Sequence, residues 1–128
     1  IMNEAIDRLF GNIPDGLVLY ENIESHLLSL GEDVLIRPRK TQISFAAERS
    51  FVWVWPPIRR MKNRPESYVI LTLGLRRRLE DRRVVEVVEP RPGRWTHHLL
   101  VTHPDDLDPT VLNWLEEAYR LAGGCGTF

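Results

Sequence analysis

Three stretches of the chain place apolar side chains at helical spacing. The strongest pattern covers residues 16–30, and its inward stripe is formed by Leu19, Tyr20, Ile23, Leu27 and Leu30. A short helix is predicted over residues 3–10. A last helix is predicted over residues 108–122, because Asp108 can cap its N-terminus and Pro109 suits the first helical position. Each apolar stripe needs a surface that buries it.

Between these helices the pattern changes to the two-residue period of strands. Residues 41–47 alternate inward and outward positions, as a half-buried strand does. Further strands are predicted over residues 51–55, 68–73, 84–88 and 95–102, and residues 34–36 can start one more. The gaps between strands are too short for crossover helices, so the strands should be antiparallel. We therefore predict an α+β fold: a mainly antiparallel five- or six-stranded sheet, with N-terminal helices and a C-terminal helix packed on one face.

Length and composition agree with a single globular domain. The chain has 128 residues, of which 43% are hydrophobic and 27% charged. We expect one domain over residues 1–128, with residues 123–128 as a flexible tail. We expect no signal peptide and no membrane contact, because no apolar run approaches the length of a membrane span. The single cysteine, Cys125, cannot form an internal disulfide, which favours a reducing cytoplasm.

Charge is strongly segregated along the chain. Formal charge is −6 over residues 1–36, +9 over residues 37–94 and −4 over residues 95–128, although the whole chain carries only −1. Two interpretations remain open. Acidic helices can lie over a basic sheet and neutralise it, or the basic middle can contact an anionic partner such as nucleic acid or an acidic protein.

The basic residues gather in two connections on either side of the strand predicted over residues 68–73. The candidate polyanion-binding residues are Arg59, Arg60, Lys62, Arg76, Arg77, Arg78, Arg82 and Arg83. The two connections lie at opposite ends of that strand, about 15–20 Å apart at about 3.3 Å per residue. A basic stripe of this length suits a polyanion better than a small phosphate ligand. Ordinary solvated loop charge explains the same pattern.

Another interpretation places a ligand or an enzymatic site on the sheet. Its polar groups would come from Arg37, Lys40, Gln42 and His98, and a pocket between the sheet and the helix over residues 16–30 would favour it. A flat basic face would instead favour a non-catalytic binding or interaction module, which can also be a homodimer. We prefer the binding module.

Aromatic side chains mark the strand over residues 51–55. Phe51, Trp53 and Trp55 are spaced to share one face of it. Such a row can stack against nucleic-acid bases, but packing in the core against the helices is its commoner use.

No residue pattern predicts a catalytic site, a metal site or a cofactor. His97 and His98 are adjacent on a predicted strand and point to opposite faces, so they cannot share one metal ion. One of them should be a partly buried histidine bonded to a neighbour. The acidic run over residues 105–108 precedes a helix, and capping of that helix explains Asp108. Glycine-rich phosphate-binding motifs are absent from the sequence.

Several short motifs, in order, resemble a bacterial domain-of-unknown-function family. The motifs are Leu19-Tyr20, Leu30-Gly31-Glu32-Asp33-Val34, Lys40-Thr41-Gln42-Ile43-Ser44-Phe45, Phe51, His97-His98-Leu99, Asp106-Leu107-Asp108 and Trp114-Leu115-Glu116-Glu117-Ala118-Tyr119. The resemblance covers about residues 16–122 and is weakest at residues 53–58. Members of that family stand alone or form the C-terminal part of endonuclease-like or zinc-finger-like proteins. The resemblance therefore implies a fold and a link to nucleic acids, and it implies no reaction.

Overall fold

The computed structural model describes residues 4–57 and 67–124. Its helices are α1 (Glu4–Phe10), α2 (Gly16–Leu28) and α3 (Pro109–Leu121), with a short 3-10 helix η1 (Pro104–Asp106) before the last. Its strands are β1 (Leu35–Pro38), β2 (Ile43–Ala46), β3 (Ser50–Trp55), β4 (Val69–Leu75), β5 (Val84–Arg91) and β6 (Arg94–Val101). The strand that residues 34–36 can start is present as β1, so the sheet has six strands.

The six strands form one antiparallel sheet in the order β1-β2-β3-β4-β6-β5. The predicted α+β class and antiparallel pairing are confirmed. β4 pairs along its whole length with β6, with Leu71 opposite Leu99, and β5 pairs with the other side of β6 at the edge of the sheet. Since β5 and β6 form a hairpin with a two-residue turn, the end of β5 lies beside the start of β6.

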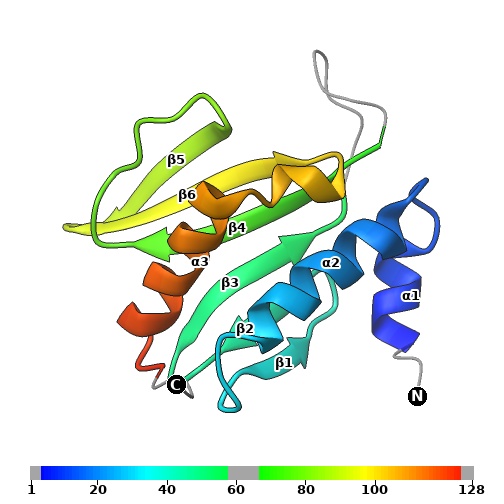
Figure 1. Cartoon of the computed structure of the whole chain (residues 1–128), viewed down its shortest axis with the longest axis horizontal. Helices are drawn as coiled ribbons and strands as arrows, with labels where there is room; N and C mark the ends of the chain where they lie inside the picture. The colour runs from blue at the N-terminus through cyan, green and yellow to red at the C-terminus, as the bar shows by residue number, and fades with distance from the viewer. Residues whose placement is uncertain (1–3, 58–66, 125–128) are drawn as a thin grey trace.

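Both long helices pack on the same face of the sheet, as predicted. Figure 1 shows α2 and α3 side by side in front of the strands. Alternate residues of the central strands, such as Leu71, Leu73 and Leu99, point to this face and are almost fully buried. The other sheet face carries no described helix.

The two ends of α3 are held by specific hydrogen bonds. Asp108 caps its start, where the carboxylate accepts a hydrogen bond from the Val111 amide at 3.0 Å. At its end, the Ala122 carbonyl accepts from the amides of Glu48 and Arg49 at 3.0 and 3.1 Å. Gly123 then turns the chain with φ of 89°, a conformation that favours glycine. The end of α3 is thus docked on the turn between β2 and β3.

The aromatic residues of β3 do not share one face, so that prediction is wrong. The pairing of β2 with β3 shifts by one residue at the start of β3, as a β-bulge does. Phe51 therefore points to the helices, and its ring lies 5.6 Å from the ring of Tyr119. Trp53 and Trp55 alternate with the helix-facing valines of the same strand and point to the uncovered face, where Trp53 lies opposite Thr72. The prediction that the row packs in the core holds for Phe51 alone.

None of the helices among residues 4–57 and 67–124 is long and apolar enough to cross a membrane.

Candidate anion-binding pocket

The predicted basic residues after β4 differ in their contacts. Arg77 donates two hydrogen bonds to the Glu117 carboxylate of α3, at 3.0 and 2.9 Å. This contact raises the pKa of Arg77 above its usual value. Arg78 lies 4.0 Å from Glu80, and Arg76 has no hydrogen bond or ion pair with another residue of the described chain. All three arginines are exposed, and Arg77 ties the sheet to α3, while the Arg78 guanidinium lies 5.9 Å from the ring centroid of Trp95.

Arg83 serves the fold rather than an open binding surface. Its guanidinium contacts both Asp81 and Asp108, and it lies 5.2 Å from the ring centroid of Trp114. Bonding to the Val111 amide and to Arg83 lowers the pKa of Asp108. Arg83 and exposed Arg82 line a cavity of about 230 Å³. Arg59, Arg60 and Lys62 lie outside the described residues.

Of the residues proposed for a site on the sheet, His98 lies far from the other three. Arg37 lies on β1, Gln42 follows the β1–β2 turn that holds Lys40, and His98 lies on β6. β6 is four strands away from β1, which at about 4.8 Å per strand is roughly 19 Å. His98 instead contacts Thr72 of the neighbouring strand, with 2.7 Å between Nδ1 and Oγ1. The preceding residue, His97, is fully buried. The prediction of a partly buried histidine bonded to a neighbour is confirmed for His98.

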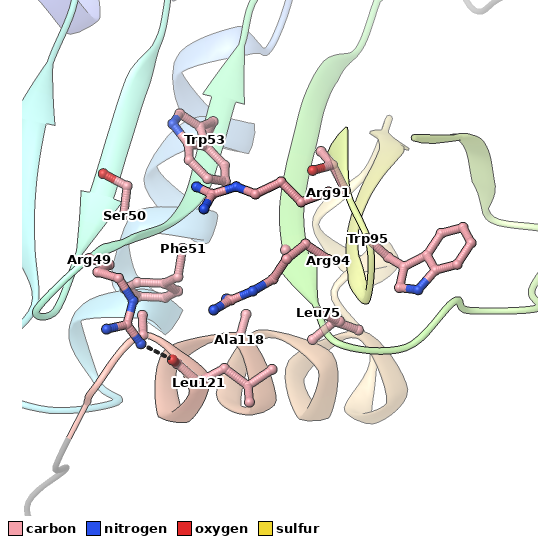
Figure 2. A pocket seen from close by; sticks show the side chains of 13 residues that line it. Arg49, Ser50, Phe51, Trp53, Leu75, Arg91, Arg94, Trp95, Ala118 and Leu121 are labelled. Atoms are coloured by element: carbon pink, nitrogen blue, oxygen red, sulfur yellow. Dashed lines mark hydrogen bonds between the residues drawn. The ribbon is translucent and has the colours of Figure 1, made fainter. Parts of the chain in front are cut away.

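A pocket of about 290 Å³ opens where β3 begins, β4 ends and β6 begins, beside the last turn of α3. Three arginines line it: Arg49, Arg91 and Arg94. Figure 2 shows Arg91 and Arg94 reaching from the β5–β6 hairpin, Arg91 toward Trp53 and Arg94 toward the side where Arg49 lies. The described lining contains no carboxylate and no histidine. Apolar walls come from Phe51 and residues of α3.

The fold holds Arg49 at this pocket through the end of α3. One terminal nitrogen of its guanidinium donates a hydrogen bond to the Leu121 carbonyl at 2.6 Å. Cationic side chains are stabilised at this position, because the last carbonyls of a helix carry partial negative charge. A guanidinium has five N–H donors, so Arg49 can hold the helix end and still donate toward a ligand.

Arg91 and Arg94 are placed by the β5–β6 hairpin. They stand directly opposite each other in the antiparallel register, on either side of the Pro92-Gly93 turn. Like charges in this arrangement repel and destabilise a hairpin. No described carboxylate forms an ion pair with either arginine. An anion bound between the two guanidinium groups would reduce this repulsion.

A glycine keeps the pocket open. Gly74 lies inside β4, a position where glycine weakens a strand. A Cβ built on Gly74 would meet no atom within 4 Å, so a side chain would project into empty space. Gly74 lines the pocket. Glycine in a strand interior is typical of a place where a ligand approaches the backbone.

A family model for a domain of unknown function, DUF5655, matches residues 12–122. The chain belongs to this family. No curated protein and no solved structure matches the chain. The family match extends over nearly all of the described DUF5655 domain, including every strand and α3.

Sequence reasoning missed the three pocket arginines of this DUF5655 domain. Arg49, Arg91 and Arg94 are isolated in the sequence, whereas the predicted candidates stand in runs. Two signals were available. The Arg91-Pro92-Gly93-Arg94 turn predicts a hairpin with arginines on both arms, and Gly74 interrupts an apolar strand. Among the described residues, no group of three or more histidine, cysteine, aspartate or glutamate side chains is arranged to hold a metal ion.

Proposed function

We propose that this DUF5655 domain is a non-catalytic binding domain for a phosphate-bearing polyanion, held at the pocket lined by Arg49, Arg91 and Arg94. The observation that carries the proposal is three guanidinium groups around one pocket whose described lining has no carboxylate. Guanidinium groups bind phosphate oxygens through paired, charge-assisted hydrogen bonds. The described part of the lining also has no histidine or carboxylate that could act as a general acid or base, which favours binding over catalysis.

The exposed arginines after β4 extend this basic surface. Leu75, the last residue of β4, lines the pocket, and Arg76 follows it directly. Arg76 and Arg78 therefore lie at the same end of the sheet as Arg91 and Arg94. A polyanion whose phosphate occupies the pocket could contact them with its neighbouring phosphates. This arrangement supports a polymer such as nucleic acid, although the pocket volume of about 290 Å³ also suits a small phosphate ligand.

As part of this proposal, we expect the domain to act in the cytoplasm of a bacterium. A chain with a single cysteine suits a reducing compartment. An association with endonuclease-like or zinc-finger-like proteins, as the family resemblance implies, would place a phosphate-binding domain beside nucleic acid. Homodimerisation would double the number of pockets and strengthen binding to a long polyanion.

Calorimetric titration with sodium tripolyphosphate in about 50 mM salt tests the proposal. The double variant Arg91→Gln, Arg94→Gln should weaken binding at least tenfold, because each charge-assisted hydrogen bond contributes about 1.5–3 kcal/mol. Affinity of the unaltered protein should fall as salt rises, since exposed charges are screened. Arg82→Gln is the matched control, because Arg82 is an exposed arginine before the start of β5, at the other end of that strand.

Two results would contradict the proposal. The first is the absence of tripolyphosphate binding by the unaltered protein at low salt. The second is an equal loss of affinity in the Arg82→Gln control, which would indicate diffuse surface charge in place of a pocket. Gly74→Val adds an independent test, because a branched side chain suits a strand and a Cβ at this position would meet no atom within 4 Å. It should abolish binding while the thermal midpoint stays the same or rises.

A further inference from the structure

The sheet face opposite the helices carries two tryptophans in line with the pocket. Trp53 and Trp55 point to this face, opposite Thr72 and Ile70 of β4, and both are partly buried and partly exposed. The indole of tryptophan has two flat aromatic faces on which a planar group can stack. Trp53 also lines the arginine pocket, so the aromatic surface and the basic site are continuous.

We propose that this face binds single-stranded nucleic acid, with bases stacked on Trp53 and Trp55 and the backbone phosphate next to the first base held in the arginine pocket. The inference rests on the proposed phosphate-binding function and names its ligand. Each nucleotide repeats one phosphate and one flat base. The surface offers the same two features in the same order, arginines first and indoles next.

The spacing of the tryptophans fits this ligand. Two residues along a strand correspond to about 6.7 Å. This is roughly twice the 3.4 Å that separates neighbouring bases in a stacked strand. Successive bases must therefore come apart to stack on Trp53 and Trp55 separately, as bases of a single strand do on aromatic side chains. Trp53 is next to the pocket and Trp55 is one step further from it, so the strand would run along β3 away from the arginines.

A duplex does not suit this surface. Its bases are already paired and stacked, so indoles on a sheet cannot reach their faces, and a helix that enters a groove would have to lie on the same side of the sheet as the tryptophans. The described helices lie on the opposite side of the sheet from the tryptophans. Sequence preference should be weak, because every base has a face that stacks.

The test measures fluorescence anisotropy of a labelled twelve-nucleotide oligothymidine and of a labelled duplex of the same length, at about 50 mM salt. Trp55→Leu removes an aromatic face outside the pocket and should weaken single-strand binding about 5- to 150-fold, the range for loss of one stacked base. Trp55→Phe is the matched variant and should stay within about threefold of the unaltered protein. It retains an aromatic ring and removes an indole Nε1 that is buried without a hydrogen-bond partner among the described residues.

The companion measurement separates this inference from the proposed function. Trp55 does not line the pocket, so Trp55→Leu should bind tripolyphosphate as the unaltered protein does. Tripolyphosphate binding together with equal single-strand affinity of Trp55→Leu and Trp55→Phe would overturn the stacking inference and leave the phosphate pocket standing. Loss of tripolyphosphate binding in Trp55→Leu, with an unchanged circular dichroism spectrum, would also overturn it.

Two further outcomes would refute the inference. Equal affinity for the duplex and the single strand would show that bases are not contacted. Light scattering could instead show a dimer of the unaltered protein that Trp55→Leu converts to a monomer. The uncovered face would then be covered by a second copy of the chain and closed to nucleic acid.

Discussion

The buried histidine of β6 makes folding stability depend on pH in a way that can be measured. His97 has no exposed surface, and its Nε2 accepts a hydrogen bond from the Leu79 amide at 3.0 Å. An accepting nitrogen carries no proton, so this bond requires the neutral ring. Burial lowers the pKa of His97, and the nearby charge of Arg77 lowers it further, while the Leu73 backbone and Glu117 oppose the shift.

The sign of the effect follows from proton linkage. Below the ordinary histidine pKa of about 6.5, the unfolded chain binds a proton at His97 that the folded protein resists. Stability is therefore fully present above pH 6.5 and falls as the pH is lowered toward the depressed folded pKa of His97. One proton sets an upper limit of about 1.36 kcal/mol per pH unit. Between pH 7.5 and 5.5 the loss integrates to at most about 1.4 kcal/mol.

Urea denaturation followed by tryptophan fluorescence at pH 7.5, 6.5 and 5.5 measures this loss. His97→Gln keeps an acceptor for the Leu79 amide and cannot titrate. Its unfolding free energy should be lower at pH 7.5, because packing is altered, and it should fall clearly less between pH 7.5 and 5.5 than that of the unaltered protein. His103→Gln, at a side chain that is 67% exposed, is the control and should retain the pH dependence of the unaltered protein.

Two carboxylates with shifted pKa values act outside this range. Asp81 and Asp108 have lowered pKa values, so the stability they contribute is lost only as the pH falls through and below their ordinary value of 3.8. If His97→Gln and the unaltered protein lose the same free energy between pH 7.5 and 5.5, then His97 is not the group responsible and the assignment of a buried neutral ring is incorrect.

Three smaller predictions concern the fold. Asp108→Ala removes the cap on the Val111 amide and the partner of Arg83, and the thermal midpoint should fall by about 3–6 °C by calorimetry. Tyr119→Phe removes the hydrogen bond that Tyr119 donates to Asp33, which should cost about 1 kcal/mol in urea denaturation; no change would show that the bond adds nothing. A chelator should leave the thermal midpoint unchanged, and a drop of several degrees would reveal a structural metal ion.

Several elements of this domain could be predicted because their causes are local. α3 follows from the cap at Asp108, the proline at its first turn and a stripe of apolar residues. The strands follow from alternation, and antiparallel pairing follows from connections too short to cross the sheet. Both long helices have one apolar stripe, and a sheet with one apolar face leaves a single place to bury both.

The candidate site could not be predicted in the same way, because it depends on register and on contacts between distant segments. A one-residue bulge opposite the end of β2 turns Phe51 toward the helices and leaves Trp53 and Trp55 on the open face. The alternation of apolar and polar residues in the sequence does not reveal that shift in register. Likewise, Arg77 forms hydrogen bonds with Glu117 of α3 and so stabilises the fold. In the sequence, Arg77 stands in a run of three arginines, which indicates a binding surface.

By itself, the sequence determined the kinds of elements, their order and their antiparallel pairing, since hydrophobic period, capping and loop length act over a few residues. Only the tertiary structure decided which charges are neutralised and which remain available. The fold brings Arg49, the residue before β3, into the same pocket as Arg91 and Arg94, which lie more than forty residues later in the sequence. The physical reason is that β6 pairs with β4 and places the β5–β6 hairpin beside the end of α3, an outcome of strand order that no short stretch of sequence encodes.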